Sequence, residues 1–475
     1  MNDISNNIKK VLMIFLICFI GLISYITYFE MVEGPKIVNY TNNRRLWVKR
    51  NEVLRGTIYD RNGKPLTKSS RVNQETQKRE YTGGEIFAHA LGYVDIKYGI
   101  TGLEKKYDKE LMDTDIEDNI KSLIKNKGKE QEKIGDNLKT TLDYDVQSKA
   151  YDLLGDNKGA VVALNPKTGE VLAIVSKPSF NPNNLQEIWQ SINTDKNRPL
   201  LNRATAGLYP PGSTFKTVTA VSALENMPGV RNRTFQDNGE LRISDKYSLH
   251  NFEGETFGNI DFKNGYVHSS NVVFGTLGLE LGNDKLKETA EKFYFNKDIP
   301  ADGIPVEQSK FPTLKNYEKG SIAQTAIGQS SDLASPLQMA LVSSTIANGG
   351  IMMKPQLVKE VQTSKGVLVK SIQPESLGQI ISTSTANTMR DYMKSVVQEG
   401  TGLNAAVEGV DVCGKTGTAD HQVDGKDATP HSWFIGFAPY DDPQIAVAVI
   451  VEDGGQGGKA AAGIASEVIR TALKK

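Results

Sequence analysis

The feature that most constrains this chain is a run of 19 residues without a charge, from Val11 to Phe29. Such a run is just long enough to cross the hydrocarbon core of a bilayer as a helix. A cleaved signal peptide is the alternative, but its apolar stretch is usually shorter, and residues 24–29 offer no small-x-small cleavage pattern. We therefore expect an uncleaved single-pass anchor at residues 11–29, preceded by a short cytoplasmic tail at residues 1–10. Basic residues flank the run on both sides, so the positive-inside rule does not decide its orientation.

Composition narrows the chemistry that the rest of the 475-residue chain can perform. Its 56 Lys and Arg residues balance its 56 Asp and Glu residues, so nucleic acid is not an expected partner. Cys18 lies in the apolar run and cannot form a structural disulfide with Cys413. None of the five histidines stands at a spacing such as HExxH, so we predict neither a His-based metal site nor a cofactor. Serine and lysine are therefore the residue types that we expect to take part in catalysis.

A chain of this length has room for two or three folded units. Residues 30–135 combine turn and strand signals, among them a hairpin-turn signal at Asn62-Gly63, and predict a small mixed module. The charged and polar stretch from Lys105 to Lys133 reads as a solvated helix followed by a linker. We place a domain boundary near residue 135.

Residues 136–475 show apolar strand patterns at both ends of the segment. Two runs, 159–164 and 170–175, are joined by a turn and predict a hairpin. Two more, 432–438 and 444–452, precede a terminal helix. With helical stretches between them, these runs predict an α+β domain whose sheet closes from the two ends of the chain.

The strongest chemical signal lies at Ser213, within the sequence Tyr-Pro-Pro-Gly-Ser-Thr-Phe-Lys. Prolines and glycine interrupt the chain just before it, and apolar residues at 215, 218, 221 and 224 then follow a helical period. Ser213 is thus expected to open an amphipathic helix. Residues three apart share a helix face, so the amine of Lys216 can reach the Ser213 hydroxyl.

Ser213 needs a base, because a serine hydroxyl is a poor nucleophile and no histidine occurs in this motif. Lys216 can serve only as a neutral amine, which requires its pKa to fall far below the ordinary lysine value. Burial, the positive end of the helix dipole and a second nearby cation all lower a lysine pKa. We therefore expect another positive group close to Lys216.

The Ser-x-x-Lys pattern alone is weak, and the chain contains a second copy at residues 122–125 within the charged linker. Two further motifs follow Ser213 in order, Ser269-Ser270-Asn271 and Lys415-Thr416-Gly417-Thr418. The first could by itself be a polar loop. The second has a twin at residues 167–169, where glycine serves the predicted hairpin turn.

Taken together, the three motifs resemble the active-site motifs of class B penicillin-binding proteins. The similarity extends to Arg55-Gly56, Asn62-Gly63 and Gly102-Leu103-Glu104 in the module after the anchor, and so covers nearly the whole chain. The resemblance implies a membrane helix, a small mixed pedestal module and a transpeptidase domain with an antiparallel sheet covered by helices on both faces. It also implies a bacterial membrane protein with most of the chain extracytoplasmic.

The resemblance assigns the reaction as peptidoglycan D,D-transpeptidation. Ser213 would attack the penultimate D-alanyl carbonyl of a stem peptide with Lys216 as base, and the terminal D-alanine would leave. Ser269 would relay a proton to the leaving amine, and Asn271 would hold Lys216 and the substrate amide. An amine of a neighbouring stem peptide would then take the acyl group. β-Lactams would acylate the same serine.

The third motif would bind the substrate's terminal carboxylate through Lys415, Thr416 and Thr418. Lys415 would also be the second cation, and Gly417 would allow a ligand backbone to approach closely. The backbone N–H groups of Ser213 and Thr418 would form the oxyanion hole. A membrane glycan polymerase of the shape-elongation-division-sporulation type is the expected partner, because the chain shows no glycosyltransferase domain of its own.

Two alternatives stay open at this point. A serine β-lactamase or D,D-carboxypeptidase shares the Ser-x-x-Lys chemistry but passes the acyl group to water. A catalytically silent membrane-tethered scaffold or β-lactam sensor would share the fold without turnover. Two departures from the family pattern also stand out: the module before residue 135 is short, and Cys413 occupies a position where a small apolar residue is expected. We predict that Cys413 is a buried, inert thiol.

Overall fold

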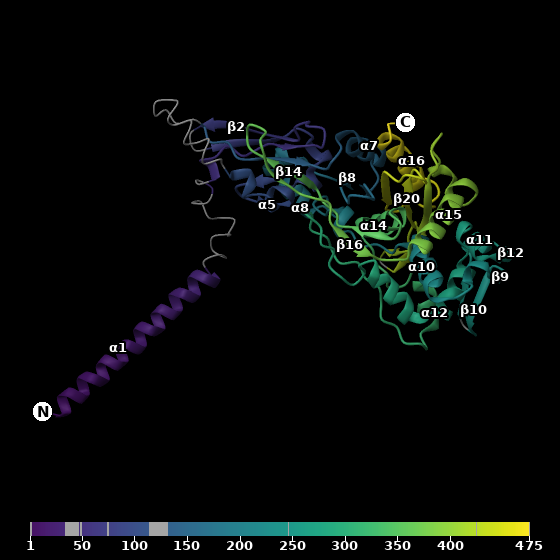
Figure 1. Ribbon diagram of the computed structural model, residues 1–475, viewed down its shortest axis with the longest axis horizontal. Coiled ribbons are helices and arrows are strands. Elements are labelled where there is room, and N and C mark those ends of the chain that lie inside the picture. Colours follow the sequence, from purple (N-terminus) through teal and green to yellow (C-terminus); the bar gives the residue numbers. More distant parts are fainter. Residues whose placement is uncertain are drawn as a thin grey trace.

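The computed structural model describes residues 2–33, 47, 50–73, 76–113, 132–245, 247–423 and 425–474. Its first element is the helix α1 (Asn2–Tyr28), which a π-helical turn extends to Glu33. Every side chain from residue 6 to residue 32 is exposed, and α1 stands clear of the folded body (Figure 1). By length and composition this helix can cross a membrane. The predicted apolar anchor segment is therefore a continuous helix.

The central sheet has five strands in the order β17-β20-β21-β7-β8, and all neighbouring strands are antiparallel. Its strands are β7 (Gly159–Leu164), β8 (Val171–Lys177), β17 (Cys413–Ala419), β20 (His431–Ala438) and β21 (Ile445–Val451). The β7–β8 hairpin thus joins the C-terminal strands through the β21–β7 pairing. The prediction that the sheet closes from both ends of the chain is confirmed.

Both faces of this sheet are covered by helices, because side chains along β21 alternate between two cores. Ile445, Val447 and Val449 belong to the core that includes α7 (Tyr144–Leu154) and α16 (Ala460–Ala472). The residues between them, Ala446, Ala448 and Ile450, belong to the core that includes the fully buried α14 (Pro336–Ala347). The layers are visible in Figure 1.

A largely helical region lies beside this sheet and carries the candidate site. It contains α10 (Lys216–Asn226), α11 (Phe262–Val267), α12 (Asn271–Lys292), α13 (Lys319–Thr325) and α15 (Thr383–Glu399). Residues 216–223 of α10 are all buried. The expectation of an amphipathic α10 was wrong over these two turns, because α12 and α15 pack against it and leave no solvent face.

The N-terminal module is built from short elements. Its hairpin pairs β2 (Thr67–Asn73) with β3 (Thr76–Tyr81), and the predicted turn at Asn62-Gly63 is present, with Gly63 at φ +88°. A four-stranded sheet in the order β1-β6-β14-β15 combines β1 (Ile58–Tyr59) with β6 (Asn137–Thr140), β14 (Val358–Gln362) and β15 (Leu368–Ser371). This sheet draws strands from both sides of residue 135, where the boundary was predicted.

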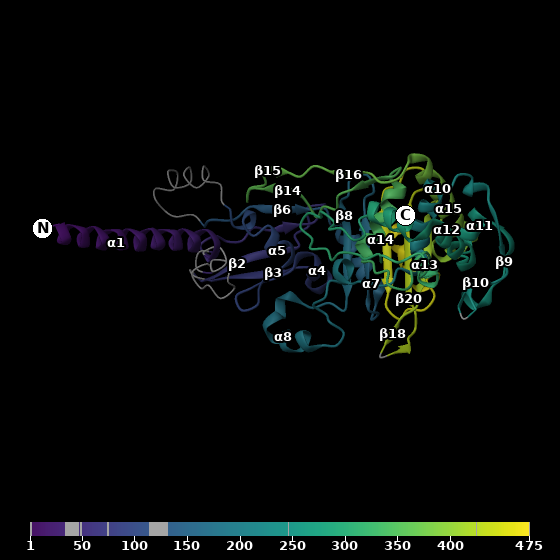
Figure 2. The ribbon, with the colours of Figure 1, turned by 90° about the horizontal axis from the view of Figure 1, so that it is seen from below.

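Smaller elements complete the described chain, and Figure 2 shows several of them. They are α4 (Ala88–Leu91), β4 (Val94–Asp95), β5 (Gly99–Ile100), α5 (Gly102–Lys106), α8 (Leu185–Thr194), α9 (Arg203–Ala206), β9 (Thr234–Asp237), β10 (Glu240–Ser244), β11 (Tyr247–His250), β12 (Gly258–Asp261), β13 (Ile351–Met353), β16 (Ser376–Gln379), β18 (Gln422–Val423) and β19 (Lys426–Asp427). The helix expected between Lys105 and Lys133 is not found in the described part of that stretch, because α5 ends at Lys106 and a 3₁₀ turn, Glu110–Met112, follows. Residues 114–131, including the second Ser-x-x-Lys pattern at 122–125, lie outside the described residues.

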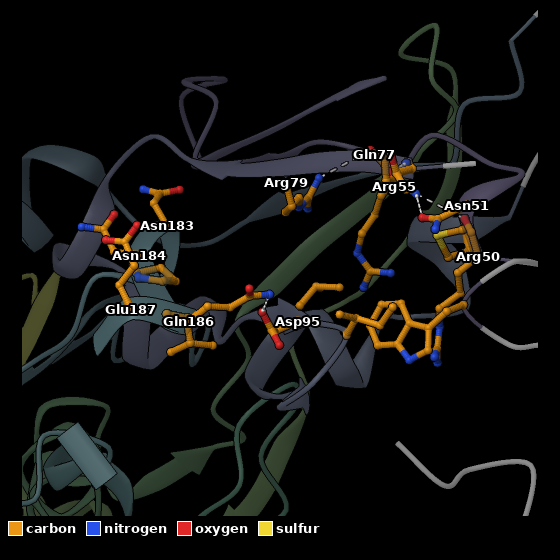
Figure 3. A pocket seen from close by; sticks show the side chains of 17 residues that line it. Arg50, Asn51, Arg55, Gln77, Arg79, Asp95, Asn183, Asn184, Gln186 and Glu187 are labelled. Atoms are coloured by element: carbon orange, nitrogen blue, oxygen red, sulfur yellow. Dashed lines mark hydrogen bonds between the residues drawn. The ribbon is translucent and has the colours of Figure 1, made fainter. Parts of the chain in front are cut away.

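A buried ionic cluster stabilises the N-terminal module. Glu104 of α5 accepts from Arg55 Nε at 2.6 Å and from Arg79 Nε at 2.8 Å, and all three side chains are almost fully buried. The two guanidinium groups outweigh the effect of burial and lower the pKa of Glu104. Arg55 and Arg79 line one side of a pocket of about 420 Å³, and residues 182–187 line the other (Figure 3). Two arginines of the cluster thus lie at the pocket between this module and residues 182–187, which lead into α8.

Candidate active site

Ser213 lies in a 3₁₀ turn, Gly212–Phe215, that leads directly into α10. Gly212 has φ +53°, and its N–H donates to the carbonyl of Gly328 at 2.9 Å. A Cβ on Gly212 would lie 2.6 Å from the carbonyl oxygen of Thr418 on β17, so this position requires glycine. The local break in the sequence therefore sets Ser213 against the edge of the central sheet. Ser213 remains partly exposed and lines a pocket.

Lys216 is completely buried one turn after Ser213. Its Nζ donates to the Ser269 carbonyl at 2.5 Å, to Ser269 Oγ at 3.2 Å and to Asn271 Oδ1 at 2.6 Å. Within the described part of the chain, these are the hydrogen bonds of the Lys216 amine, and none joins it to Ser213. Burial and the neighbouring Lys415 lower the pKa of Lys216 well below its usual range, while Asp237 opposes the shift. The amine thus has the environment that the sequence analysis required of a base.

Lys415 is the second cation at the site, and it too is completely buried. Its Nζ donates to Ser269 Oγ at 3.0 Å and to the carbonyl of Thr416 at 3.0 Å. Burial lowers the pKa of Lys415 to about 7. The Ser269 hydroxyl therefore lies between two buried amines, one from α10 and one from β17. Ser269 has φ +60°, a conformation that a non-glycine residue adopts only when its surroundings impose it.

The other residues of the third motif lie at the same pocket, which has a volume of about 370 Å³. Thr416 and Thr418 line it, together with Asn271 and Thr401. The hydroxyls of Thr416 and Thr401 are 2.6 Å apart and hydrogen-bonded. Residues from three distant segments of the chain thus converge on Ser213.

Gly417 has a structural role that the sequence did not indicate. A Cβ at this position would lie 2.8 Å from the Thr214 methyl group and 3.1 Å from the Pro211 carbonyl. The missing side chain lets β17 lie directly against the turn that carries Ser213. This contact is within the protein, whereas the sequence analysis expected glycine to admit a ligand.

A hydrogen-bonded group behind the second motif escaped the sequence analysis. Ser270 caps the N-terminus of α12, and its hydroxyl donates to the buried carboxylate of Asp237. Asn251 Nδ2 also donates to Asp237, at 2.8 Å, while Asn251 Oδ1 accepts from the N–H of Asn271 at 2.7 Å. Asp237 and Asn251 stand in a polar, turn-rich segment with no recognisable spacing, so no sequence signal distinguished them from ordinary loop residues.

The two remaining sequence predictions concern Cys413 and the twin motif. Cys413 is buried, and burial raises the pKa of its thiol far above the usual value, in agreement with an inert residue. Residues 167–169 lie in the turn between β7 and β8, where Gly169 has φ +74°, as the hairpin predicted.

A partly exposed serine at a helix start, a buried lysine one turn on and a second buried lysine on the adjoining strand define an acyl-serine enzyme. Comparison with known proteins identifies its family. The penicillin binding protein transpeptidase domain matches residues 159–470, and the penicillin binding protein A dimerisation domain matches residues 55–137. The chain therefore belongs to the class B penicillin-binding proteins, the family of peptidoglycan D,D-transpeptidases.

Individual relatives agree with this membership. The peptidoglycan D,D-transpeptidase PbpA of Mycolicibacterium smegmatis is 35% identical over 420 residues, which cover 84% of this chain and 84% of the relative. The ceftriaxone acyl-enzyme of penicillin-binding protein A from M. tuberculosis aligns with a TM-score of 0.83 and 29% identity, over 90% of this chain and 100% of that one. A D,D-transpeptidase domain from Eggerthella lenta aligns with a TM-score of 0.79 and 34% identity, over 89% and 99% of the two chains.

Proposed function

We propose that this protein cross-links peptidoglycan stem peptides through an acyl-enzyme on Ser213, with release of the terminal D-alanine, and that β-lactams acylate the same residue. The observation that carries the proposal is the position of the Ser269 hydroxyl between the two buried amines of Lys216 and Lys415. This arrangement offers a route for a proton from the nucleophile to the leaving group. The relay uses Ser269 and the two lysines and needs no histidine as a base, although His268 lines the same pocket.

In the first step Lys216, as a neutral amine, accepts the proton of Ser213 while Ser213 Oγ bonds to the penultimate D-alanyl carbonyl carbon. The N–H groups of Ser213 and Thr418 stabilise the resulting oxyanion, a contribution of about 3 kcal/mol for each donor in comparable enzymes. The C–N bond then breaks, and the proton passes through Ser269 to the departing D-alanine amine. An ester on Ser213 remains.

In the second step the amine of a neighbouring stem peptide attacks this ester and loses a proton to the same relay. The ester C–O bond breaks, and Ser213 Oγ takes a proton back from Lys216. Asn271 holds Lys216 and the substrate amide. In the first step, before the terminal D-alanine leaves, Lys415, Thr416 and Thr418 bind its carboxylate. The depressed pKa of Lys216 supports the base role, and the position of the Lys415 amine beside Ser269 supports carboxylate binding. Gly417 supports the site through the close approach of β17 to the Ser213 turn.

The chain is proposed to have four parts. The cytoplasmic tail is residues 1–10, the membrane anchor is residues 11–29, the pedestal with its linker is residues 30–135, and the transpeptidase domain is residues 136–475. The exposed apolar surface of α1 supports single-pass anchoring, with the bulk of the chain on the extracytoplasmic side where stem peptides occur. A membrane glycan polymerase of the shape-elongation-division-sporulation type is the proposed partner. Co-purification of such a polymerase with the tagged full-length chain tests the proposed partnership. A tagged chain that is purified from membranes without a polymerase would count against it.

A fluorescent penicillin tests the enzymatic proposal. The wild type and Ser122→Ala, a control at the second Ser-x-x-Lys pattern, should label covalently, whereas Ser213→Ala should not. Equal labelling of Ser213→Ala would contradict the proposal. The lifetime of the adduct separates the two acceptors: retention for hours fits a transpeptidase, and release within seconds would instead identify a β-lactamase.

A further inference from the structure

Two histidines and an aspartate that no motif connects meet at one end of the central sheet. His431 begins β20, where it pairs with Ala419, the last residue of β17. His421 follows β17 by two residues, and Asp453 follows β21 by two. Because β17, β20 and β21 are neighbours in the sheet, the three side chains meet although up to 32 positions of sequence separate them. A search for spacings such as HExxH cannot find such a group.

The distances among their donor atoms suit one metal ion. One donor atom from each residue lies within 4.8 Å of the other two. His421 Nε2 is 3.1 Å from Asp453 Oδ1, and His431 Nδ1 is 3.9 Å from the same oxygen. Ligand atoms about 2.0–2.1 Å from a tetrahedral zinc ion are about 3.3 Å apart, a value between the two observed distances. The separations of the donor atoms therefore suit one ion, and one imidazole ring must turn out of the stacked arrangement for both rings to point at it.

Without an ion, a ring stack and two hydrogen bonds hold the three residues. The imidazole rings are stacked with their centroids 3.9 Å apart, and His421 Nε2 pairs with the Asp453 carboxylate. His421 Nδ1 is buried and has no hydrogen-bond partner among the described residues. The backbone N–H of Asp453 donates to His431 Nδ1 at 3.2 Å, which shows that this nitrogen carries a lone pair. Lys158 pairs with the other Asp453 oxygen, Oδ2, at 3.5 Å, so Oδ1 stays directed at the histidines.

We propose that His421, His431 and Asp453 form a Zn²⁺ site. Two imidazole nitrogens and one carboxylate oxygen favour zinc over Mg²⁺ or Ca²⁺, which prefer oxygen ligands throughout. Three protein ligands leave a fourth position for water. Bound zinc would replace the hydrogen bond from the Asp453 N–H to His431.

Such an ion would join two segments that border the active-site pocket. Asp420, next to His421, lines that pocket, and so does Gln456, three residues after Asp453. The N–H of Gly457 in the same segment donates to Thr418 Oγ1 at 3.3 Å. Zinc at this place stabilises the pocket wall beside Thr418 without contact to Ser213.

Cobalt titration of the full-length protein in detergent tests the site. Bound metal is first stripped from the protein with a chelator, and the chelator is then removed. The wild type should show the visible spectrum of one tetrahedral Co²⁺ per chain, displaced by Zn²⁺. Asp453→Asn and His421→Ala should weaken binding at least tenfold, a typical lower bound for disturbing a metal shell. His250→Ala, which removes an exposed histidine outside the group, should bind as the wild type does.

Thermal unfolding gives a second measurement, because a ligand that binds only the folded state raises the melting temperature. Zn²⁺ should raise the melting temperature of the wild type and of His250→Ala but not that of Asp453→Asn. The proposal fails if the wild type shows no saturable cobalt spectrum, or if Asp453→Asn binds as tightly as the wild type. Neither measurement uses a β-lactam or stem peptide, so failure here leaves the acylation of Ser213 untouched.

Discussion

At the scale of single residues, the site depends on how much water is excluded from two amines. Lys216 and Lys415 are both completely buried, and desolvation is the main cause of both lowered pKa values. Their proposed tasks require opposite charge states, since Lys216 must be neutral to accept a proton and Lys415 must be charged to bind a carboxylate. Acylation therefore requires a pH at which Lys216 is neutral while Lys415 still carries its charge.

The pKa of Lys415, which burial lowers to about 7, predicts a basic limb in the pH profile of acylation by a β-lactam. The second-order rate constant should fall as pH increases through about 7, because Lys415 then loses the charge that holds the substrate carboxylate. Stopped-flow acylation between pH 5 and pH 9 measures this limb.

Lys415→Arg is the matched control for this profile, since a guanidinium stays charged over the whole range. The variant should lose the basic limb even if its maximal rate is lower. An unchanged basic limb in Lys415→Arg would assign that limb to another group.

At the scale of elements, the contact between β17 and the Ser213 turn positions the residues of the site. This close contact is possible because Gly417 has no side chain. Gly417→Ala would place a methyl group 2.8 Å from the Thr214 methyl group. Overpacking of this kind costs about 1–3 kcal/mol, and a shift of β17 would also move Thr416 and Thr418. We expect a lower melting temperature together with slower acylation.

Gly463→Ala is a control for which we expect the opposite change in melting temperature. Gly463 lies within α16, and a Cβ there would meet no atom within 4 Å. Alanine in a helix interior is favoured over glycine by roughly 0.5–1 kcal/mol, so this variant should melt slightly higher and acylate normally. Similar losses in both variants would contradict the contact argument.

The buried cluster of the N-terminal module predicts a second stability effect. Glu104→Gln removes the carboxylate that Arg55 and Arg79 share, and loss of one partner from a buried ion pair costs about 3–5 kcal/mol. The folded-state pKa of Glu104 is lowered, so its stabilisation is present above the unfolded pKa and is lost as pH falls through the folded one.

Thermal melts at neutral and acid pH test both statements, with Asp245→Asn as the control. Asp245 forms an exposed ion pair with Arg242, a kind of pair that contributes little. Glu104→Gln should lower the melting temperature strongly at neutral pH, and the difference from the wild type should shrink in acid. A difference independent of pH would contradict the assignment to this carboxylate.

At the scale of the whole molecule, an exposed apolar helix precedes a body that does not pack against it. Deletion of residues 2–33 removes side chains that are exposed from residue 6 to residue 32, so no described core is lost. The shortened protein should leave the membrane fraction and still label with fluorescent penicillin. Fractionation followed by labelling checks this, and retention of the labelled product in the membrane would indicate another membrane contact.

Local sequence patterns were enough to predict the parts of this protein that depend on neighbouring residues. The 19-residue uncharged run, the Pro-Pro-Gly break before Ser213, the Asn62-Gly63 turn and the apolar strand runs are local patterns, and each corresponds to an element in the structure. The order of the three motifs also indicated the family. Periodicity was less reliable for α10, because burial on all sides depends on helices that lie far away in sequence.

The folded structure was needed to show which distant groups meet. It placed Ser269 between two lysines that are 199 positions apart, put Asp237 and Asn251 behind Asn271, and gave Gly417 its contact with Thr214. It also brought His421, His431 and Asp453 together although no spacing relates them. The physical reason is that sheet pairing and core packing fix contacts across long sequence separations, whereas local patterns specify only the elements that take part.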